Sequence, residues 1–88
     1  MPSGGTTKPG PISIAIAEIL NREFRNSEFV SQSQLSAVVG ISQSQLSKLL
    51  RGDRMLYVEQ LYALCTALHL DIGAVFRQAQ ATALRQQH

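Results

Sequence analysis

The sequence has one cysteine, no tryptophan, and only three phenylalanines and two tyrosines in 88 residues. The single cysteine, Cys65, excludes an intramolecular disulfide and a cysteine-rich zinc site, so we expect it to be a small core residue. Because aromatic residues are few, the hydrophobic fraction of 44% predicts an aliphatic core. No apolar run reaches about 18 residues and no signal-peptide segment is visible, which predicts a cytoplasmic protein without a membrane partner.

Proline is absent after residue 11, and half of the six glycines also lie before residue 12. This composition predicts a flexible N-terminal arm over residues 1–11 and a helical body from residue 12 onward. The length allows one small domain. We expect that domain to span residues 12–76, followed by a helical extension over residues 77–88.

A short motif is written twice: V-S-Q-S-Q-L-S at residues 30–36 and I-S-Q-S-Q-L-S at residues 41–47. A tandem repeat, a polar low-complexity tract and two adjacent helix starts would each give such a pattern. The third explanation accounts for every position, because each serine can cap a helix and accept a bond from the third helical amide. The glutamine there can reach back to the amide of the serine, and the flanking aliphatic residues can form a hydrophobic staple. The residues in these roles are Val30, Ser31, Gln34 and Leu35, then Ile41, Ser42, Gln45 and Leu46.

Apolar residues elsewhere recur at spacings of three and four, which is typical of helices with one buried face. Gly40 and Gly52 are placed to end the two capped helices. Asp71 can cap a last helix that carries Ile72, Val75 and Phe76 inward. The sequence therefore predicts an all-α fold of five helices, at residues 12–24, 31–39, 42–51, 58–68 and from residue 71.

Positive charge is concentrated in one window. The chain has a formal net charge of +2. Between residues 42 and 54, Lys48, Arg51 and Arg54 stand against a single acid, Asp53, so this window carries the same excess as the whole chain. The positive field is therefore local, and it begins at the second copy of the motif.

Residues 30–52 resemble the helix-turn-helix of the lambda-repressor-like (Cro and Xre) family of bacterial and phage transcription regulators. Gln32, Gly40, Leu46 and Leu49 hold the positions of the family's first glutamine, turn glycine and two apolar residues beyond it. The resemblance extends over residues 12–76, and it implies a five-helix lambda-repressor-like domain. The chain departs from the family pattern at Ser36, where alanine is usual, and at Tyr57, where a serine, threonine or proline usually opens the fourth helix.

The resemblance implies that the motif spans residues 31–51 and that its recognition helix, residues 42–51, lies in the DNA major groove. The amide of Gln43 can pair with adenine, and serine hydroxyls can bond to any base. The residues expected to read bases are Gln43, Ser44, Ser47 and Lys48. Those expected to contact phosphates are Gln32, Ser42, Arg51 and Arg54, and Gln32 can also brace Gln43. Plainer interpretations stay open, namely a solvated helix face and surface charges without a partner.

Nothing in the sequence points to catalysis. The acidic residues are scattered, and no Ser-His-Asp set, phosphate loop or carboxylate pair can be assembled. His69 and His88 are isolated, so no metal site is expected. We also expect no cofactor and no small-molecule ligand.

These observations favour a sequence-specific regulator of transcription that binds double-stranded DNA, a phage or bacterial repressor or Cro-like protein. It would lie at the bacterial nucleoid or, if phage-encoded, in the host cytoplasm. A homodimer would read one operator half-site per subunit, and its expected interface is an apolar trace near the C-terminus: Phe76, Ala79, Ala83 and Leu84. The alternative is a protein-interaction module, such as an antitoxin-like or scaffold subunit, with weak or no DNA binding.

Overall fold

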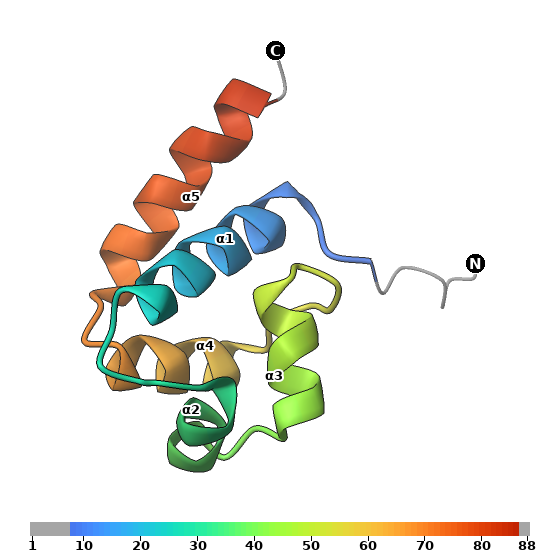
Figure 1. Cartoon of the computed structure of the whole chain (residues 1–88). Helices are drawn as coiled ribbons and strands as arrows, with labels where there is room; N and C mark the ends of the chain where they lie inside the picture. Colours follow the sequence, from blue (N-terminus) through green and yellow to red (C-terminus); the bar gives the residue numbers. More distant parts are fainter. Residues whose placement is uncertain (1–7, 87–88) are drawn as a thin grey trace.

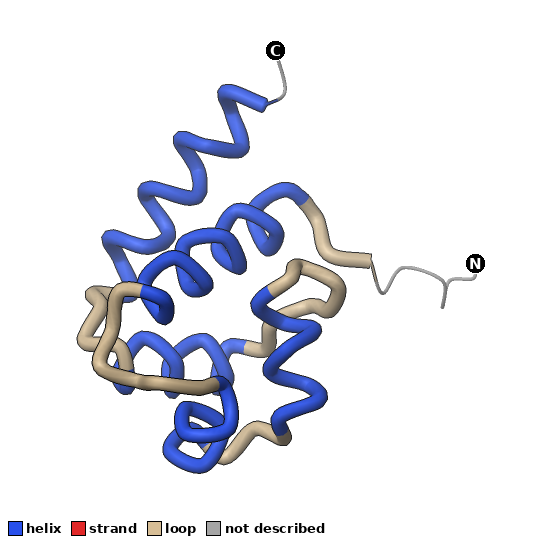
Figure 2. Tube along the Cα trace, viewed as in Figure 1, coloured by secondary structure: helices blue, strands red, loops and turns tan. Residues whose placement is uncertain are grey.

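A computed structural model describes residues 8–86, in which five α-helices are joined by short connections and no strand is present (Figures 1 and 2). The all-α fold predicted from the sequence is thus confirmed within that range. Most of the predicted arm and His88 lie outside it. The helices are α1 (Pro11–Arg25), α2 (Gln32–Val39), α3 (Gln43–Leu50), α4 (Val58–Ala67) and α5 (Ile72–Gln86). No helix among the described residues is long and apolar enough to cross a membrane.

The core is aliphatic, as predicted. Its largest fully buried side chains are all leucines, and they come from four helices: Leu20, Leu35, Leu46, Leu49 and Leu64. Each such burial stabilises the fold by about 1.5–3 kcal/mol relative to an exposed side chain. Cys65 is also buried, and this burial, together with the nearby Asp71 carboxylate, raises the pKa of its thiol. The thiol is therefore held neutral as part of the core.

Helix α5 is continuous from residue 72 to residue 86, so the predicted boundary between residues 76 and 77 falls inside it. Asp71 acts as its cap, as predicted, because the Asp71 Oδ2 accepts a hydrogen bond of 2.9 Å from the Ala74 amide. Figure 1 shows α5 rising beside α1, and these two helices form the most extensive contact between elements.

Two expectations for α5 are wrong. Ala79 and Ala83 were expected at a subunit interface, but they are 0% and 4% exposed within the single chain. Phe76 was expected to point inward but is 42% exposed. Val75, Ala79 and Ala83 are spaced by four residues and share the side of α5 that is buried, whereas Phe76 is rotated by about 100° from Val75. Leu84, at 60%, is exposed as expected.

Candidate nucleic-acid interface

The turn between α2 and α3 is fixed by one glycine conformation and two hydrogen bonds. Gly40 has a left-handed conformation, with φ 72° and ψ 24°, which residues other than glycine rarely adopt. Its amide donates a 3.0 Å hydrogen bond to the Ser36 carbonyl. The Ser36 hydroxyl donates across the turn to the Ile41 carbonyl. The serine found where the family has alanine thus adds a bond that ties the two helices together.

Both serine caps predicted from the doubled motif are present. The Ser31 Oγ accepts a bond of 3.1 Å from the Gln34 amide, and the Ser42 Oγ accepts one of 3.2 Å from the Gln45 amide. Gln34 reaches back as expected but one residue further, since its Oε1 accepts from the Val30 amide at 2.9 Å. The two capping serines therefore begin α2 and α3 by the same local interaction.

The two copies differ in their apolar contacts. Ile41 is 6% exposed and belongs to the same core cluster as Leu46, in agreement with the predicted staple. Val30 is 86% exposed, so the staple predicted for the first copy is wrong. The preceding residue, Phe29, packs against the core instead and anchors the chain before α2. Only the second copy therefore has buried apolar residues on both sides of its capping serine.

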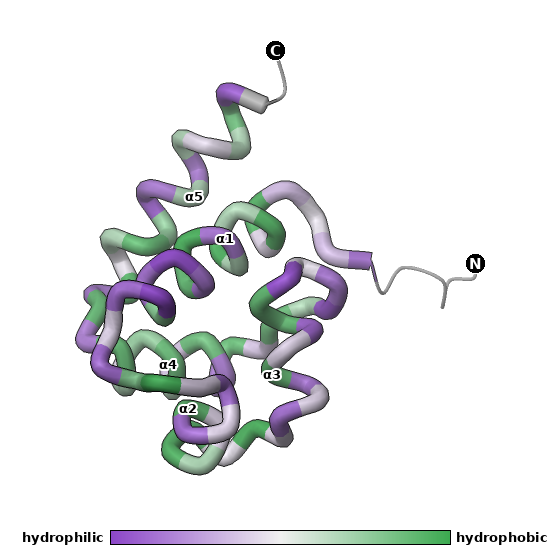
Figure 3. The backbone as a smooth tube through the Cα atoms, in the orientation of Figure 1, coloured by the Kyte–Doolittle hydropathy of each residue, from purple (hydrophilic) through white to green (hydrophobic). Residues whose placement is uncertain are grey.

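Helix α3 is sharply amphipathic. Leu46, Leu49 and Leu50 are buried, and the helix packs against α2 and α1. Hydrophilic and hydrophobic residues alternate along it in Figure 3. All residues expected to read bases lie on its solvent side: Gln43, Ser44 and Lys48 are exposed, and Ser47 is half-buried. Ser42 is exposed at its start.

The structure brings Ser47 and Arg51 together with a residue that the sequence analysis did not assign. The Arg51 Nε lies 3.0 Å from the Asp53 Oδ2, and its Nη1 lies 3.4 Å from the Ser47 Oγ. Asp53 returns to α3 because Gly52 is left-handed, with φ 80°, and because the Asp53 amide donates to the Lys48 carbonyl at 2.9 Å. The R-G-D sequence was the available signal, since a glycine after a helix end folds the next residue back.

The remaining two residues lie apart from this cluster. Gln32, at the start of α2, is half-buried, and within residues 8–86 no hydrogen bond joins it to Gln43. The expected brace is therefore not formed in this structure. Arg54 is exposed in the connection between α3 and α4, beside a cavity of about 340 Å³ that it lines together with Asp53, Met55 and Tyr57.

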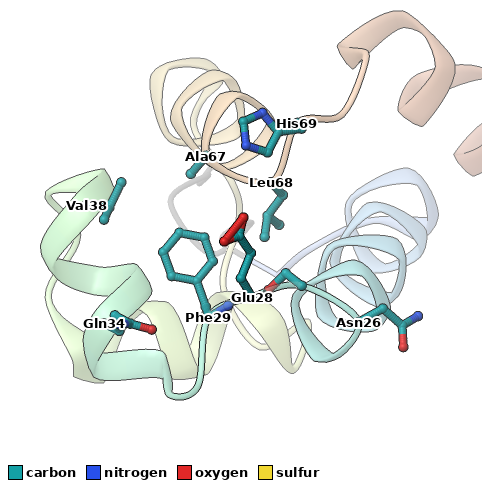
Figure 4. Close-up of a pocket in the computed structure, with 9 residues that line it drawn as sticks. Asn26, Glu28, Phe29, Gln34, Val38, Ala67, Leu68 and His69 are labelled. Atoms are coloured by element: carbon teal, nitrogen blue, oxygen red, sulfur yellow. Dashed lines mark hydrogen bonds between the residues drawn. The ribbon is translucent and has the colours of Figure 1, made fainter.

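A larger cavity, of about 420 Å³, is lined by none of the residues expected to contact DNA. Figure 4 shows Phe29 and Glu28 between Val38 of α2 and Leu68 at the end of α4. His69 borders the same cavity. In the part of the chain that the structure describes, no three His, Cys, Asp or Glu side chains are grouped as metal ligands.

Comparisons with known proteins agree with this geometry. The crystal structure of the clp gene regulator ClgR from Corynebacterium glutamicum matches 91% of this chain and 83% of its own, with a TM-score of 0.76 and 24% identity. A second crystal structure of ClgR from the same organism matches 85% and 95%, with a TM-score of 0.73 and 23% identity. These likenesses show a shared fold, and no curated protein matches the sequence.

A family model described as "Helix-turn-helix" matches residues 22–75, which include α2, α3 and α4 in full. The family consists of DNA-binding domains of the Cro/C1 type and not of enzymes, in agreement with the expectation from the sequence. The chain therefore belongs to the lambda-repressor-like helix-turn-helix family.

Proposed function

We propose that this protein is a sequence-specific transcription regulator that inserts α3 into the major groove of double-stranded DNA. One observation carries the proposal: the solvent side of α3 is uncharged and polar at its start and basic at its end, while the opposite side is locked in the core. A helix held in this way presents its side chains to base edges in a fixed register. The fold is also that of a protein described as a gene regulator.

Base reading is assigned to the first two turns of α3. Gln43 can donate to adenine N7 and accept from its N6 amino group, while the Ser44 and Ser47 hydroxyls can bond to any base. Lys48, one helical turn beyond Ser44, can reach guanine. Gln43, Ser44 and Lys48 are exposed, while Ser47 is half-buried and is the most restrained of the four because of its bond with Arg51.

Phosphate contacts are assigned to residues around that surface. The Ser42 Oγ already accepts from the Gln45 amide, so its hydroxyl hydrogen remains available for a phosphate oxygen. The positive end of the α3 dipole lies at the same place and favours an anion. Gln32 and Arg54 flank α3 in sequence on either side and suit positioning contacts that carry no base information.

We infer that two copies associate through the side of α5 that α1 leaves uncovered. Phe76 and Leu84 are exposed there, and Leu84 borders a groove of about 240 Å³ together with Pro11 and Ile12 of α1. A dimer would place two recognition helices in successive major grooves, about 34 Å apart. Sedimentation velocity of the free protein tests this. A monomer at every concentration, together with one protein per duplex carrying two half-sites, would contradict it.

The rival function, a protein-interaction module, would need apolar anchors on the outer side of α3. In the part of the chain that the structure describes, the exposed large apolar side chains lie in the other helices and connections, not on α3. This distribution favours DNA as the partner of α3.

The direct test begins with a preferred duplex selected by the protein from a library of random sequences. Fluorescence anisotropy then compares this duplex with a scrambled one over a range of salt concentrations. We expect Gln43→Ala to lose about 1–3 kcal/mol of discrimination at one base pair. The matched control is Gln45→Ala, because Gln45 is an exposed glutamine of the same helix that is not among the residues assigned to base reading. Equal affinity for selected and scrambled duplexes at every salt concentration would refute sequence-specific binding.

A further inference from the structure

We propose that Arg51 reads a base and that Asp53 is the residue that positions it. This inference rests on the proposed function and deepens it. It replaces the phosphate contact that the sequence suggested for Arg51, and it assigns a role to an acidic side chain that otherwise has no place on a DNA-binding surface.

The place of Arg51 on the helix favours contact with a base. Arg51 is the C-cap of α3 and keeps right-handed helical dihedrals, with φ −83° and ψ −8°. It therefore continues the helical register at about 100° per residue. In that register the polar residues follow one another within about 140°, in the order Gln43, Ser47, Arg51, Ser44 and Lys48. Around the helix axis, Arg51 therefore lies in the middle of the base-reading face, and along the axis it lies at the C-terminal end of α3.

The guanidinium of Arg51 is also held in a direction that suits contact with a base. Its Nε donates to Asp53 at 3.0 Å and its Nη1 to Ser47 at 3.4 Å, so the side chain runs back along the base-reading face. An arginine has five N–H donors. With these two engaged, the Nη2 donors and one Nη1 donor remain free. Two parallel donors at the end of the guanidinium are what the O6 and N7 acceptors of guanine require.

The charges of the Arg51–Asp53 pair also favour a base over a phosphate. Phosphate contacts gain affinity because a cation displaces condensed counterions from the DNA. Arg51 carries its own counterion, since the Asp53 carboxylate lies 3.0 Å away and is 58% exposed. A phosphate would meet both charges, and its repulsion from Asp53 offsets its attraction to Arg51. Guanine is neutral, so the pair can face it without that penalty.

Asp53 is itself held in a fixed position. The Asp53 amide is bonded to the Lys48 carbonyl at 2.9 Å. The Gly52 backbone lies against α1, where a Cβ added to Gly52 would come within 3.8 Å of the Ala17 Cβ. Asp53 therefore follows a turn whose position is fixed by contact with α1. An ion pair with both side chains this exposed contributes little to folding, so both residues can be replaced in a folded protein.

The experiment uses the full chain, the duplex that the wild type selects from a random library, a scrambled duplex, and three variants. Arg51→Ala should weaken binding to the selected duplex by about 5- to 150-fold and abolish the preference at one G·C pair. Asp53→Asn removes a negative charge, so it should bind the scrambled duplex more tightly. Its ratio of selected to scrambled affinity should nevertheless fall toward that of Arg51→Ala, because Arg51 is no longer held in place.

The matched control is Asp71→Asn. Asp71 also pairs with an arginine, Arg77, at 3.7 Å, and asparagine can keep its capping bond to the Ala74 amide. Figure 1 places the start of α5 on the opposite side of the molecule from α3. This variant makes the same change in net charge and should leave the ratio of affinities unchanged.

Two results would overturn the inference while leaving the proposed function intact. In one, Arg51→Ala weakens binding to both duplexes by the same factor. In the other, Asp53→Asn strengthens binding to both equally. The first result would make Arg51 a phosphate contact, and the second would show that Asp53 does not position Arg51 for base reading. A wild-type protein without any sequence preference would instead refute the proposed function, and the inference with it.

Discussion

At the scale of single residues, His69 stands out because it is the one residue other than glycine with positive φ, at 60°, among residues 8–86. It follows α4, where the Leu70 amide donates to the Cys65 carbonyl at 2.8 Å and the His69 amide to the Thr66 carbonyl at 3.2 Å. This pattern usually takes glycine at the left-handed position. The helix end is therefore formed at a cost of conformational energy.

We expect His69→Gly to raise the free energy of unfolding by about 0.5–1 kcal/mol, because a left-handed L-residue costs about 1–2 kcal/mol and the flexibility of glycine in the unfolded chain cancels part of the gain. Urea unfolding followed by circular dichroism measures the change. His69→Ala is the control, since it removes the imidazole but keeps the strained conformation. A variant with glycine no more stable than the one with alanine would show that φ is not the cause.

At the scale of the elements, the same serine cap begins both helices of the helix-turn-helix. Ser31 and Ser42 make the same bond to the third amide of their helices. Only the second serine also begins the helix proposed to enter the major groove. The contribution of Ser42 to the stability of the fold and its proposed contribution to DNA binding can therefore be separated by substitutions that keep or remove the cap.

We expect Ser42→Ala to lower the free energy of unfolding by about 0.5–2 kcal/mol, because the Gln45 amide loses its acceptor. Ser42→Asp should restore the stability, since aspartate is an equally good cap. It should still weaken DNA binding, because a carboxylate would face a phosphate. Ser33→Ala, at an exposed position of α2, is the control and should change neither property. If Ser42→Asp binds DNA as tightly as the wild type, the phosphate contact assigned to Ser42 is wrong.

The elements were largely predictable because their ends are coded by neighbouring residues. Serine caps, Gly40 and Gly52 act within a few positions of the chain, so their spacing predicted α2 and α3 closely. The predictions that were wrong concern the exposure of single side chains, which depends on contacts with residues distant in the sequence. Neither the exposure of Val30 nor that of Phe76 follows from spacing alone. Which of two adjacent apolar residues turns inward is decided by the helix packed against them.

The candidate site was also predictable only in part. The polar side of α3 was predictable from helical periodicity, since three buried leucines define the opposite side. The link between Arg51 and Asp53 was missed because it depends on the left-handed turn at Gly52. Charge counting placed Asp53 in the basic window only as an opposing charge. Its position in space makes it a partner of one arginine.

At the scale of the whole molecule, the end of the chain belongs to the same core as the helix-turn-helix. Ala79 is fully buried and, with Leu46 of α3 and Leu64 of α4, is part of one cluster. Helix α5 makes its main contact with α1, which in turn packs against α3. Helix α3 is thus supported from α5 through α1, and a change at the α1–α5 contact should alter the stability of the entire fold.

We therefore expect Ala79→Leu to lower the free energy of unfolding by about 1–3 kcal/mol, because a larger side chain at a fully buried position forces α5 away from α1. Gln78→Leu, which adds an apolar side chain at an exposed position, is the matched control and should have little effect. Thermal unfolding should remain a single transition shifted to lower temperature, since one core is being loosened. A separate early transition, with the rest of the protein melting as in the wild type, would mean that residues 77–86 are an appendage and that residues 12–76 fold on their own. An unshifted transition would mean that α5 does not support α3 at all.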